Sequence, residues 1–493
     1  MLIKLKELIT ELEADKIVGD LSADLQGIAY DSREVEDDYL FVAISGFETD
    51  GHQYIADAVA NGAQAVIVEK EVEPLDIPMI KVDDSRTALA KVSAKFYDYP
   101  ARDLTVVGVT GTNGKTTTTY LIEGILSNLG LETGLVGTIK NKVGHKEESA
   151  SRTTPESLDL QRMFAAMLAD GVTHVVMEVS SHALALDRVL EIDFDRKVFT
   201  NLSRDHLDFH ENFADYLAAK LKLFKSNDQP SIINLDDSRA GEISAAIDGE
   251  VITYGIKEDA NFAAENINVT AKGVEYNLLS ADDSLEIDLN LTGRFNVYNS
   301  LAAIAAVASL DFPLVKIKKG LEKINGVPGR FELIQEGQNY GVVVDYAHTP
   351  DGMENVLKTA HECSERDVIV VFGCGGDRDR KKRPMMGQLG INEADFAVIT
   401  SDNPRSEVPG DIIAEIEAGI KDLERDVSAE YTIIKDRGAA IKVAVERAQA
   451  GDVVLIIGKG HETYQDFGER VIDFDDREEA RKAIEQLRIE KSN

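Results

Sequence analysis

The sequence predicts an α/β protein of three domains, with a mostly parallel sheet in the central domain and a Rossmann-like C-terminal domain. Short β-branched runs alternate with longer segments of helical periodicity, which is typical of parallel sheets covered by helices. The chain has 493 residues, and at ~150 residues per domain this length predicts about three domains. Turn-rich stretches at residues 98–103 and 325–331 place the boundaries, giving domains 1–100, 101–328 and 329–493.

Composition and cysteine content exclude several classes of protein. A hydrophobic content of 43% and a charged content of 29% are typical of a globular protein in water. No apolar run reaches the ~18 residues that a membrane helix needs, and the N-terminus lacks a signal-peptide core. Cys363 and Cys374 are the only cysteines, so a disulfide framework and a four-cysteine zinc site are excluded. We therefore expect a cytoplasmic protein without membrane insertion.

The formal net charge of −35 argues against nucleic-acid binding, which needs a basic surface. Such a charge also repels anionic small molecules. An anion site in this chain must therefore be locally cationic, through Mg²⁺, a helix N-terminus or clustered arginine and lysine. The densest cationic run, residues 378–383, is expected to supply such a cluster.

The first hundred residues are expected to form a small α/β unit. Periodicity and β-branched runs predict a helix, two strands, a helix and a strand, at residues 2–12, 28–33, 39–44, 56–63 and 65–68. Asp31, Ser32 and Arg33 place a hydroxyl and a guanidinium at a strand end, although a surface turn is the alternative.

The central domain is organised around residues 106–117, where a β-branched strand ends in glycines and Lys115-Thr116 opens a helix. Glycines allow backbone N–H groups to approach a polyphosphate, and the helix N-terminus adds donors and a positive dipole end. Lys115 would meet the β- and γ-phosphates of ATP, and the Thr116 hydroxyl would bind Mg²⁺. Val109 stands where the strict P-loop pattern has glycine, so an ordinary βα turn with a surface lysine is the alternative.

Further strands are predicted in this central P-loop ATPase domain, and one of them ends in a carboxylate. They lie at residues 133–138, 173–178 and 197–200, with helices at 217–224 and 300–309 and with Pro155 in the first turn of another helix. Glu178 ends a buried strand where a second Mg²⁺ contact is wanted, and a structural carboxylate is the alternative. Residues 201–210 hold two histidines and two aspartates, for which metal-binding and solvated-loop interpretations both stay open. Nothing in the composition distinguishes Lys220 from a lysine on a solvated helix face.

The third domain carries polar residues after four predicted strands. The strands lie at residues 341–344, 368–372, 396–400 and 453–457, and the helices at 353–360 and 412–420. The loops that follow these strands are residues 345–348, 373–378, 402–405 and 458–462. Open α/β sheets bind ligands beyond the carboxyl ends of their strands, so these four loops predict a binding site.

These motifs, in their order along the chain, resemble those of the Mur ligases, the amide-forming ligases of bacterial peptidoglycan synthesis. The resemblance covers essentially the whole chain and rests on residues 111–116, 177–182, 201–208, 329–330 and 345–350. It is closest to the members that add the third residue of the stem peptide to UDP-MurNAc-L-Ala-D-Glu. It implies three successive domains, for the UDP-sugar, ATP and the amino acid, and we expect a monomer that uses ATP and Mg²⁺.

The resemblance also implies roles for residues at matching positions. The catalytic residues would be Lys115, His206, Lys220 and Arg330. The ATP contacts would be Gly111, Thr112, Asn113, Gly114, Lys115, Thr116, Thr117, Asn299, Arg330 and Asp345. The UDP-MurNAc-dipeptide would contact Ser32, Thr153, Thr154, Ser180 and Arg188. Mg²⁺ would be held by Thr116, Glu178, His206 and Lys220, the last as a carbamate.

The amino acid that is added is expected to be meso-diaminopimelate, with L-lysine as the alternative. Residues 402–405 resemble the motif of diaminopimelate-adding members, and Arg405 can form a bidentate pair with the carboxylate that lysine lacks. Val408 departs from the family pattern, which more often has aspartate there. The amino-acid contacts would be Arg378, Asp402, Asn403, Pro404, Arg405, Gly458 and Glu462.

The family mechanism suits these parts. ATP phosphorylates the D-Glu γ-carboxylate to an acyl phosphate, which the incoming amine attacks, releasing phosphate. Two alternatives are a ligase similar to folylpolyglutamate synthase, against which the Asp31-Ser32-Arg33 region argues, and a P-loop switch that hydrolyses ATP slowly. The switch would show ATPase activity without the other substrates.

Overall fold

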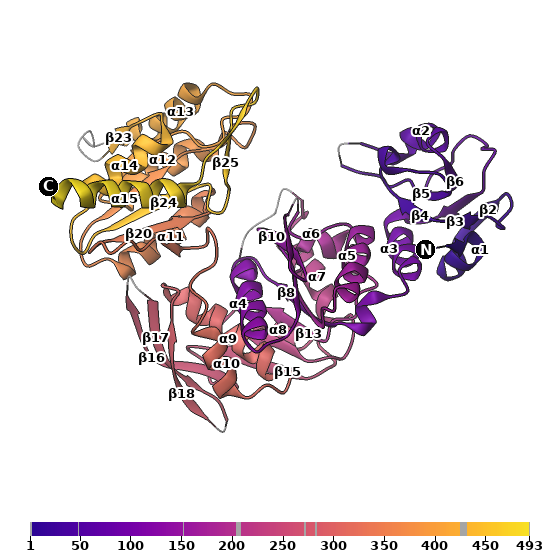
Figure 1. Ribbon diagram of the computed structural model, residues 1–493, viewed down its shortest axis with the longest axis horizontal. Coiled ribbons are helices and arrows are strands. Elements are labelled where there is room, and N and C mark those ends of the chain that lie inside the picture. The colour runs from indigo at the N-terminus through magenta and orange to yellow at the C-terminus, as the bar shows by residue number, and fades with distance from the viewer. Residues whose placement is uncertain are drawn as a thin grey trace. The chain divides into compact units, whose positions relative to one another are not determined.

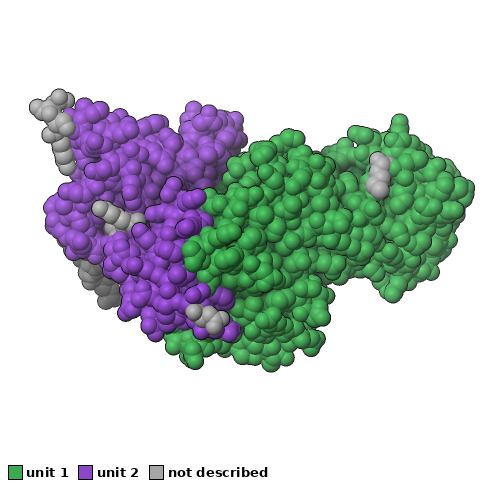
Figure 2. All heavy atoms as spheres, turned by 60° about the horizontal axis from the view of Figure 1, so that its bottom comes forward, with its two compact units in different colours: residues 1–260, 302–317 green, residues 261–301, 318–493 purple. Residues whose placement is uncertain are grey.

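A computed structural model describes residues 2–47, 49–150, 152–203, 209–270, 273–281, 283–423 and 431–492. The chain forms two compact units, shown in Figure 2: unit 1 holds Met1–Ala260 and Ala302–Ile317, and unit 2 holds Asn261–Leu301 and Lys318–Asn493. Both units contain parallel strands with helices packed against them, which confirms the α/β class. The division into 1–100, 101–328 and 329–493 stays a prediction.

The N-terminal part of unit 1 has a five-stranded sheet in the order β2-β7-β6-β5-β4, parallel except for β2. Its two faces bury separate apolar clusters, because Leu40 and Val42 point to one side and Phe41 and Ala43 to the other. The elements are β1 (Ile3–Lys4), α1 (Leu5–Leu8), β2 (Ala14–Val18), β3 (Asp24–Leu25), β4 (Gly27–Ala29), β5 (Tyr39–Val42), α2 (Ile55–Ala60), β6 (Ala63–Val68), β7 (Met79–Val82) and α3 (Ser85–Phe96).

Two predicted elements of this region were too long. The helix expected at residues 2–12 is shorter, because Ile3 and Lys4 pair with β3 as a strand before α1 begins. The strand expected at residues 28–33 ends at Ala29, because the Asp31 carboxylate accepts the Arg33 N–H and starts a short 3₁₀ helix at Ser32.

A second sheet of unit 1 has the order β11-β10-β9-β12-β8-β13-β14-β15 and is parallel from β9 to β15. Its strands are β8 (Thr105–Thr110), β9 (Thr133–Val136), β10 (Lys140–Val143), β11 (Lys146–Ser149), β12 (His174–Glu178), β13 (Arg196–Phe199), β14 (Ser231–Asn234) and β15 (Val251–Gly255). The helices of this region are α4 (Lys115–Asn128), α5 (Ser157–Ala169), α6 (Ser181–Ala185), α7 (Phe213–Phe224) and α8 (Ala240–Ser244). β8 lies between β12 and β13, so the segment after β8 starts from the middle of the sheet (Figure 1).

The helix after Pro155 starts later than expected. Glu156 is the N-cap of α5, so Pro155 precedes the helix and does not lie in its first turn. Further along the chain, helices α9 (Arg294–Ala308) and α10 (Leu314–Leu321) follow.

Unit 2 contains three antiparallel strands and a separate C-terminal sheet. The antiparallel strands are β16 (Phe262–Thr270), β17 (Gly273–Leu279) and β18 (Ser284–Leu289). The C-terminal sheet has the order β19-β20-β24-β21-β22-β23 and is parallel except for β19. Its strands are β19 (Glu332–Leu333), β20 (Gly341–Asp345), β21 (Val368–Phe372), β22 (Phe396–Ile399), β23 (Tyr431–Ile433) and β24 (Val453–Ile457), with the hairpin β25 (Tyr464–Asp466) and β26 (Val471–Asp473) beyond it.

Helices cover both faces of the C-terminal sheet (Figure 1). Val370 and Leu455 pack with helices on one face, whereas Val371 and Ile456 pack with helices on the other. Strands buried on both faces are near-continuous apolar runs in sequence, which explains why these strands were predicted correctly. The helices of the first face are α11 (Pro350–Cys363), α12 (Lys382–Asn392) and α13 (Pro409–Lys421), and those of the second are α14 (Arg437–Arg447) and α15 (Asp476–Ser492). In the described part of the chain, no helix combines the length and hydropathy of a membrane span.

Candidate active site

The loop between β8 and α4 turns at glycines, as the P-loop motif predicts. Gly111 has a φ of +150°, and a Cβ there would lie 1.9 Å from the Thr200 Oγ1, so only glycine fits. Gly114, with a φ of +84°, is the N-cap of α4. The first N–H groups of a helix have no acceptor within the helix, and its dipole is positive at this end. The N-terminus of α4 therefore has the donors and the dipole direction that favour an anion.

Two amides of the loop face the protein, contrary to the expectation that the loop N–H groups turn toward a phosphate. The Thr112 N–H donates to the Asn201 carbonyl (2.8 Å), and the Asn113 N–H donates to the Asn201 Oδ1 (2.9 Å). The Thr200 hydroxyl completes the contact by donating to the Asn113 carbonyl (2.6 Å). The segment after β13 therefore fixes the shape of the loop.

Lys115 folds back over the loop. Its Nζ donates to the carbonyls of Gly111 (3.0 Å) and Thr112 (2.9 Å). A bound polyphosphate would compete with these carbonyls for the ammonium group, and a charged acceptor forms the stronger hydrogen bond.

Glu178, Thr116 and Thr138 form a cluster of oxygen atoms, in which Glu178 and Thr116 are buried. Glu178 ends β12 and is 1% exposed. Its Oε2 accepts from the hydroxyls of Thr116 (3.0 Å) and Thr138 (3.1 Å), and its Oε1 accepts from the Thr138 N–H (2.8 Å). Carboxylate and hydroxyl oxygens are the ligands that Mg²⁺ prefers, so this donor set fits that ion. Across the described residues, no group of three or more His, Cys, Asp or Glu side chains is close enough to hold a metal ion by itself.

Lys220 lies inside the protein, so a solvated helix face is the wrong interpretation of this residue. Its side chain, on α7, is 1% exposed. The Nζ donates to the Gly111 carbonyl (2.8 Å) and stands 4.6 Å from the centroid of the Tyr216 ring. Lys220 and Lys115 therefore donate to the same carbonyl, that of Gly111 in the P-loop. His206, expected beside them, lies outside the described residues.

Four residues expected to hold the UDP-MurNAc-dipeptide gather next to Glu178. Thr153 and Thr138 exchange a hydroxyl hydrogen bond (3.0 Å), and the Thr154 hydroxyl donates to the Glu178 carbonyl (2.8 Å). Arg188 donates to the Thr154 carbonyl (3.1 Å). The fourth, Ser180, caps α6 by accepting the Ala183 N–H (3.2 Å) and lies 3.3 Å from the Thr154 hydroxyl. Ser32, the fifth expected residue, is buried in the 3₁₀ helix after β4.

Three arginines surround one buried carboxylate near this group. The Glu156 Oε1 lies 3.1 Å from Arg86, 3.2 Å from Arg152 and 3.0 Å from Arg188. Burial lowers the pKa of Arg188, and Glu156 opposes that effect. The cluster holds the Arg188 guanidinium in place and carries more positive than negative charge in an otherwise acidic chain.

In unit 2, Asp345 and Arg330 lie at the end of β20. The Asp345 carboxylate accepts the N–H groups of Phe331 (2.7 Å) and Ala347 (2.7 Å). Burial raises the pKa of Asp345, and the Arg330 charge opposes that rise. The Arg330 guanidinium carbon stands 5.0 Å from the centroid of the Tyr346 ring. Asn299, expected at the ATP site with these two residues, is on α9 and donates to the Asn296 Oδ1 (2.9 Å).

Lys459 joins the loop after β22 to the loop after β24. Its Nζ is buried and donates to the Asn403 Oδ1 (2.9 Å) and the Glu462 Oε2 (2.9 Å). The Asn403 Nδ2 donates to the same Glu462 oxygen (2.8 Å). Asp402 lies beside Gly458, where a Cβ would come 2.5 Å from the Asp402 Oδ2. Burial would raise the pKa of Asp402, but the charges of Arg437 and Lys459 lower it below the ordinary value.

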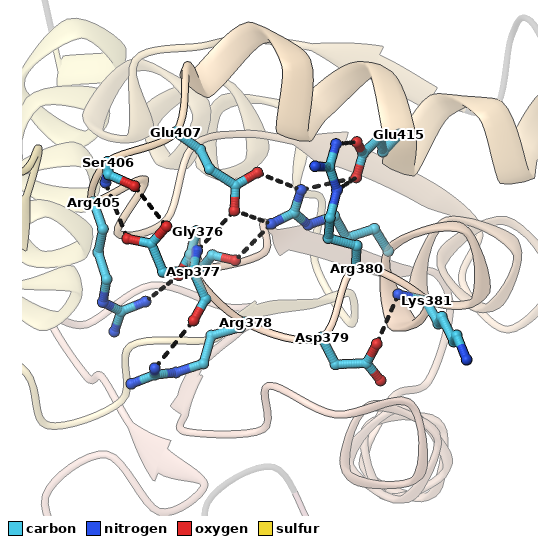
Figure 3. Close-up of polar contacts among 12 residues, drawn as sticks. Gly376, Asp377, Arg378, Asp379, Arg380, Lys381, Arg405, Ser406, Glu407 and Glu415 are labelled. Atoms are coloured by element: carbon cyan, nitrogen blue, oxygen red, sulfur yellow. Dashed lines mark hydrogen bonds and ion pairs between the residues drawn. The ribbon is translucent and has the colours of Figure 1, made fainter. Parts of the chain in front are cut away.

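The cationic run at residues 378–383 is not the open anion site that its charge suggested. Arg383 is 0% exposed and pairs with Glu407 and Glu415. Arg380 also pairs with Glu415 (Figure 3). The Arg378 Nη1 donates only to the neighbouring Asp377 carbonyl (3.2 Å) among the contacts in Figure 3. Arg405 donates to the Gly376 carbonyl (2.7 Å). Carboxylates of α13 and of the loop before it therefore neutralise much of the run.

Family descriptions match three successive parts of this chain. "Mur ligase family, catalytic domain" matches residues 24–97, "Mur ligase middle domain" matches residues 109–307, and "Mur ligase, glutamate ligase domain" matches residues 329–460. A relative from Halalkalibacterium halodurans is 47% identical over 98% of this chain and 99% of its own length. The chain belongs to the Mur ligase family.

Two relatives and one solved structure share a name. The Halalkalibacterium protein is named UDP-N-acetylmuramoyl-L-alanyl-D-glutamate--2,6-diaminopimelate ligase. So is a protein of Caldanaerobacter subterraneus subsp. tengcongensis, which is 47% identical over 94% of this chain and 95% of its own length. A solved structure of a protein with that name covers 99% of this chain and 100% of its own, with a TM-score of 0.73 and 34% identity.

Sequence reasoning missed four residues that shape the site of this Mur ligase. Thr138 follows β9, which was predicted, and its position at a strand end was the signal that could have found it. Lys459 lies in a loop that was predicted to bind, between two residues that were named. Glu156 was not singled out, because two of its three arginine partners, Arg86 and Arg188, are far away in sequence. Arg383 was expected only as part of the cationic run, because its partners Glu407 and Glu415 are also distant in sequence.

Proposed function

We propose that this Mur ligase joins meso-diaminopimelate to the D-Glu γ-carboxylate of UDP-MurNAc-L-Ala-D-Glu, with ATP, in the cytoplasmic synthesis of the peptidoglycan precursor. The name shared by two relatives of nearly the same length supports this reaction. The observation that carries it in the structure is the Arg405 loop, which the protein holds among buried polar groups at the end of β22.

The reaction would proceed in two steps. The D-Glu γ-carboxylate attacks the γ-phosphorus of ATP, forming an acyl phosphate and releasing ADP. The deprotonated amine of the amino acid then attacks the acyl carbon, and the tetrahedral intermediate collapses to the amide with loss of inorganic phosphate. Lys115 and the N-terminus of α4 would orient the phosphates, and Asn299, Arg330 and Asp345 would hold the rest of the nucleotide. Gly111, Thr112, Asn113, Gly114 and Thr117 would shape the loop around it.

Mg²⁺ would be held by Thr116 and Glu178, whose oxygens already converge, together with His206 and a carbamate on Lys220. When bound, Mg²⁺ supplies positive charge that stabilises the negative oxygens gathered around a transferring phosphoryl group. The burial of Lys220 beside the Gly111 carbonyl supports a role in this site and not at the surface.

The UDP-MurNAc-dipeptide would bind in unit 1. Thr153, Thr154, Ser180 and Arg188 lie in one hydrogen-bonded group, and Ser32 would contact the same substrate from the N-terminal sheet. This assignment agrees with three domains in the ranges 1–100, 101–328 and 329–493, the first for the UDP-sugar and the last for the amino acid. We propose that the enzyme acts as a monomer.

Selection of meso-diaminopimelate over L-lysine would depend on Arg405. Its guanidinium suits a bidentate pair with the distal carboxylate, Arg378 would assist from the neighbouring loop, and Glu462 would accept the distal ammonium. Asp402, Asn403, Pro404 and Gly458 would shape the pocket. Lysine would leave the two arginines without a carboxylate partner from the ligand. Sites built to bind a polar group reject a ligand that lacks it by up to ~10⁴–10⁵-fold.

A ligation assay with purified protein tests this proposal. UDP-MurNAc-L-Ala-D-Glu, ATP, Mg²⁺ and meso-diaminopimelate are supplied together and then omitted one at a time, with the product identified by mass spectrometry. We expect tripeptide product and stoichiometric ADP only in the complete mixture. ADP release that needs neither the UDP substrate nor the amino acid would favour a slow ATPase switch, and glutamate addition to a folate would favour the folylpolyglutamate synthase type.

A further inference from the structure

A buried arginine lies beneath the two loops that carry Arg378 and Arg405. We call residues 373–378 the glycine loop and residues 402–407 the arginine loop. Arg383, in the first turns of α12, donates from Nη1 to the Glu407 Oε2 (2.9 Å) and from Nη2 to the Glu407 Oε1 (2.7 Å). The same Nη2 donates to the Gly375 carbonyl (3.3 Å). One fully buried side chain therefore contacts both loops.

The backbones of the two loops also touch each other directly. The Gly376 N–H donates to the Asn403 carbonyl (2.9 Å), and the Arg405 Nη1 donates to the Gly376 carbonyl (2.7 Å). A Cβ on Gly376 would lie 1.8 Å from the Pro404 carbonyl oxygen, so no larger residue fits. The position of one loop therefore decides the position of the other.

Asp377 of the glycine loop also contacts Ser406 and Glu407 of the arginine loop (Figure 3). The Asp377 carboxylate accepts the Ser406 N–H (3.2 Å) and the Ser406 hydroxyl (2.6 Å). In return, the Asp377 N–H donates to the Glu407 Oε1 (2.7 Å). Glu407 therefore belongs to the arginine loop and contacts both Arg383 and the glycine loop.

Two residues of these loops have a left-handed backbone conformation, which is unfavourable for residues other than glycine. Asp377 has a φ of +53°, and Arg405 has a φ of +51°. Left-handed backbone of this kind persists only where the surroundings hold it. The hydrogen bonds of Glu407 and Asp377 provide that hold, and Figure 3 shows the Arg378 and Arg405 side chains extending from the loops so fixed.

We propose that Arg383 and Glu407 are positioning residues for amino-acid selectivity, which they set by locking the glycine loop against the arginine loop. This inference rests on the proposed function, in which Arg378 and Arg405 bind the distal carboxylate. A buried ion pair adds little net stability compared with apolar residues, so its value here is the geometry that it imposes. Bidentate recognition needs both guanidiniums in place before the ligand arrives.

Glu407→Gln and Glu415→Gln form a matched pair of variants that tests this. Each removes the charge from one carboxylate partner of Arg383. Only Glu407 belongs to the arginine loop and contacts the glycine loop, at the Asp377 N–H. Glu415 lies on α13, and its other partner is Arg380, outside the two loops. For each variant we would measure kcat and KM separately for meso-diaminopimelate and L-lysine, KM for ATP, and Tm.

Glu407→Gln is expected to lower kcat/KM for meso-diaminopimelate by about 10- to 100-fold, mostly through KM, because misplacement by ~1 Å can cost ~10²-fold. The preference over lysine should shrink at least about tenfold, with KM for ATP unchanged. Glu415→Gln should keep the preference within about twofold even if Tm falls. An unchanged preference in a folded Glu407→Gln protein, or equal losses in both variants, would overturn the inference.

Ser406→Ala supplies a second variant on the protein surface, where unfolding is not a concern. It removes one of the two hydrogen bonds to Asp377, and we expect the preference to fall about three- to fivefold. Full preference in this variant and in Arg383→Lys would also overturn the inference. Failure of the proposed function is distinguishable, because the unmodified enzyme would then show no preference for meso-diaminopimelate to lose.

Discussion

At the scale of single residues, the charged groups of the candidate site already have protein partners. Lys115 donates to loop carbonyls, Glu178 accepts from two threonines, and Glu462 accepts from Lys459 and Asn403. Burying an unpaired charge is costly, so the charged groups of a site for charged substrates need hydrogen-bond partners within the protein when no substrate is bound. Substrate binding would therefore exchange one set of partners for another.

Lys115→Ala should lower kcat by at least ~10²–10³-fold, because it removes a charge that stabilises the transferring phosphoryl group. Tm should stay close to that of the unmodified enzyme, since these hydrogen bonds join Lys115 to carbonyls of its own loop. Steady-state ligation and a thermal melt check this. Lys222→Ala, at a half-exposed lysine paired with Asp187, is the control and should retain activity. Near-normal ligation by Lys115→Ala would contradict the ATP site.

Lys220→Ala should be almost inactive, and short carboxylates such as acetate or formate should partly restore it. The reason is that a carbamate on Lys220 would supply an anionic oxygen ligand, which a small carboxylate can replace. Activity is measured against carboxylate concentration, with Lys115→Ala as a variant that carboxylates should not rescue. Full activity without added carboxylate would contradict the carbamate, as would a complete lack of rescue over a wide concentration range.

At the scale of elements, the strands of the C-terminal sheet were predicted closely and several contacts around them were not. The expected ranges 341–344, 368–372, 396–400 and 453–457 agree with β20, β21, β22 and β24 because apolar runs identify strands buried on both faces. Helix α12 was missed, since its first turn contains Arg383 and Pro384 and looked like a charged loop. The pairing of Arg383 with Glu407 and Glu415 spans 24 and 32 residues, which no local pattern reports.

The same contrast holds for the candidate site. The glycine turn of the P-loop and the position of Glu178 beside Thr116 follow from local motifs, whereas Thr153, Thr154 and Arg188 were named only through the resemblance to the family. The contact of Lys220 with Gly111 could not be derived from composition, because a lysine on an amphipathic helix is usually solvated. Only the fold shows that this face of α7 is turned inward.

The contact between α12 and the arginine loop predicts how stability depends on pH. The hydrogen bonds from Arg383 lower the pKa of Glu407 from 4.5 to about 2. A depressed carboxyl pKa stabilises the folded state above pH 4.5, and this contribution is lost as the pH falls toward 2. Denaturant melts of Glu407→Gln should therefore show a smaller loss of stability across this interval than those of the unmodified enzyme. Parallel curves would contradict the pairing.

At the scale of the whole molecule, an acidic protein must bind acidic substrates. The net charge is −35, whereas the cationic groups are concentrated at particular places, such as the three arginines around Glu156 in unit 1. Long-range repulsion acts before binding, and local attraction acts after it. Salt screens the long-range repulsion more than the local attraction, because exposed charges are screened strongly and buried charges much less.

Raising the ionic strength from about 0.02 M to 0.15 M should therefore increase kcat/KM for the UDP-MurNAc-dipeptide, since the Debye length falls below ~10 Å. The zwitterion meso-diaminopimelate has no net charge, and its kcat/KM should change little over the same range. Steady-state kinetics at saturating concentrations of the other substrates check this. A decrease for the UDP substrate would mean that local cations control its approach as well as its binding.

A direct competition between meso-diaminopimelate and L-lysine measures the selectivity that we propose for this Mur ligase. Equal concentrations of meso-diaminopimelate and L-lysine are supplied with UDP-MurNAc-L-Ala-D-Glu and ATP, and the two tripeptide products are quantified by mass spectrometry early in the reaction. The ratio of products gives the ratio of the kcat/KM values. We expect at least about a thousandfold excess of the diaminopimelate product, which Arg405→Ala should reduce sharply. Comparable amounts of the two products from the unmodified enzyme would contradict the proposed selectivity for meso-diaminopimelate.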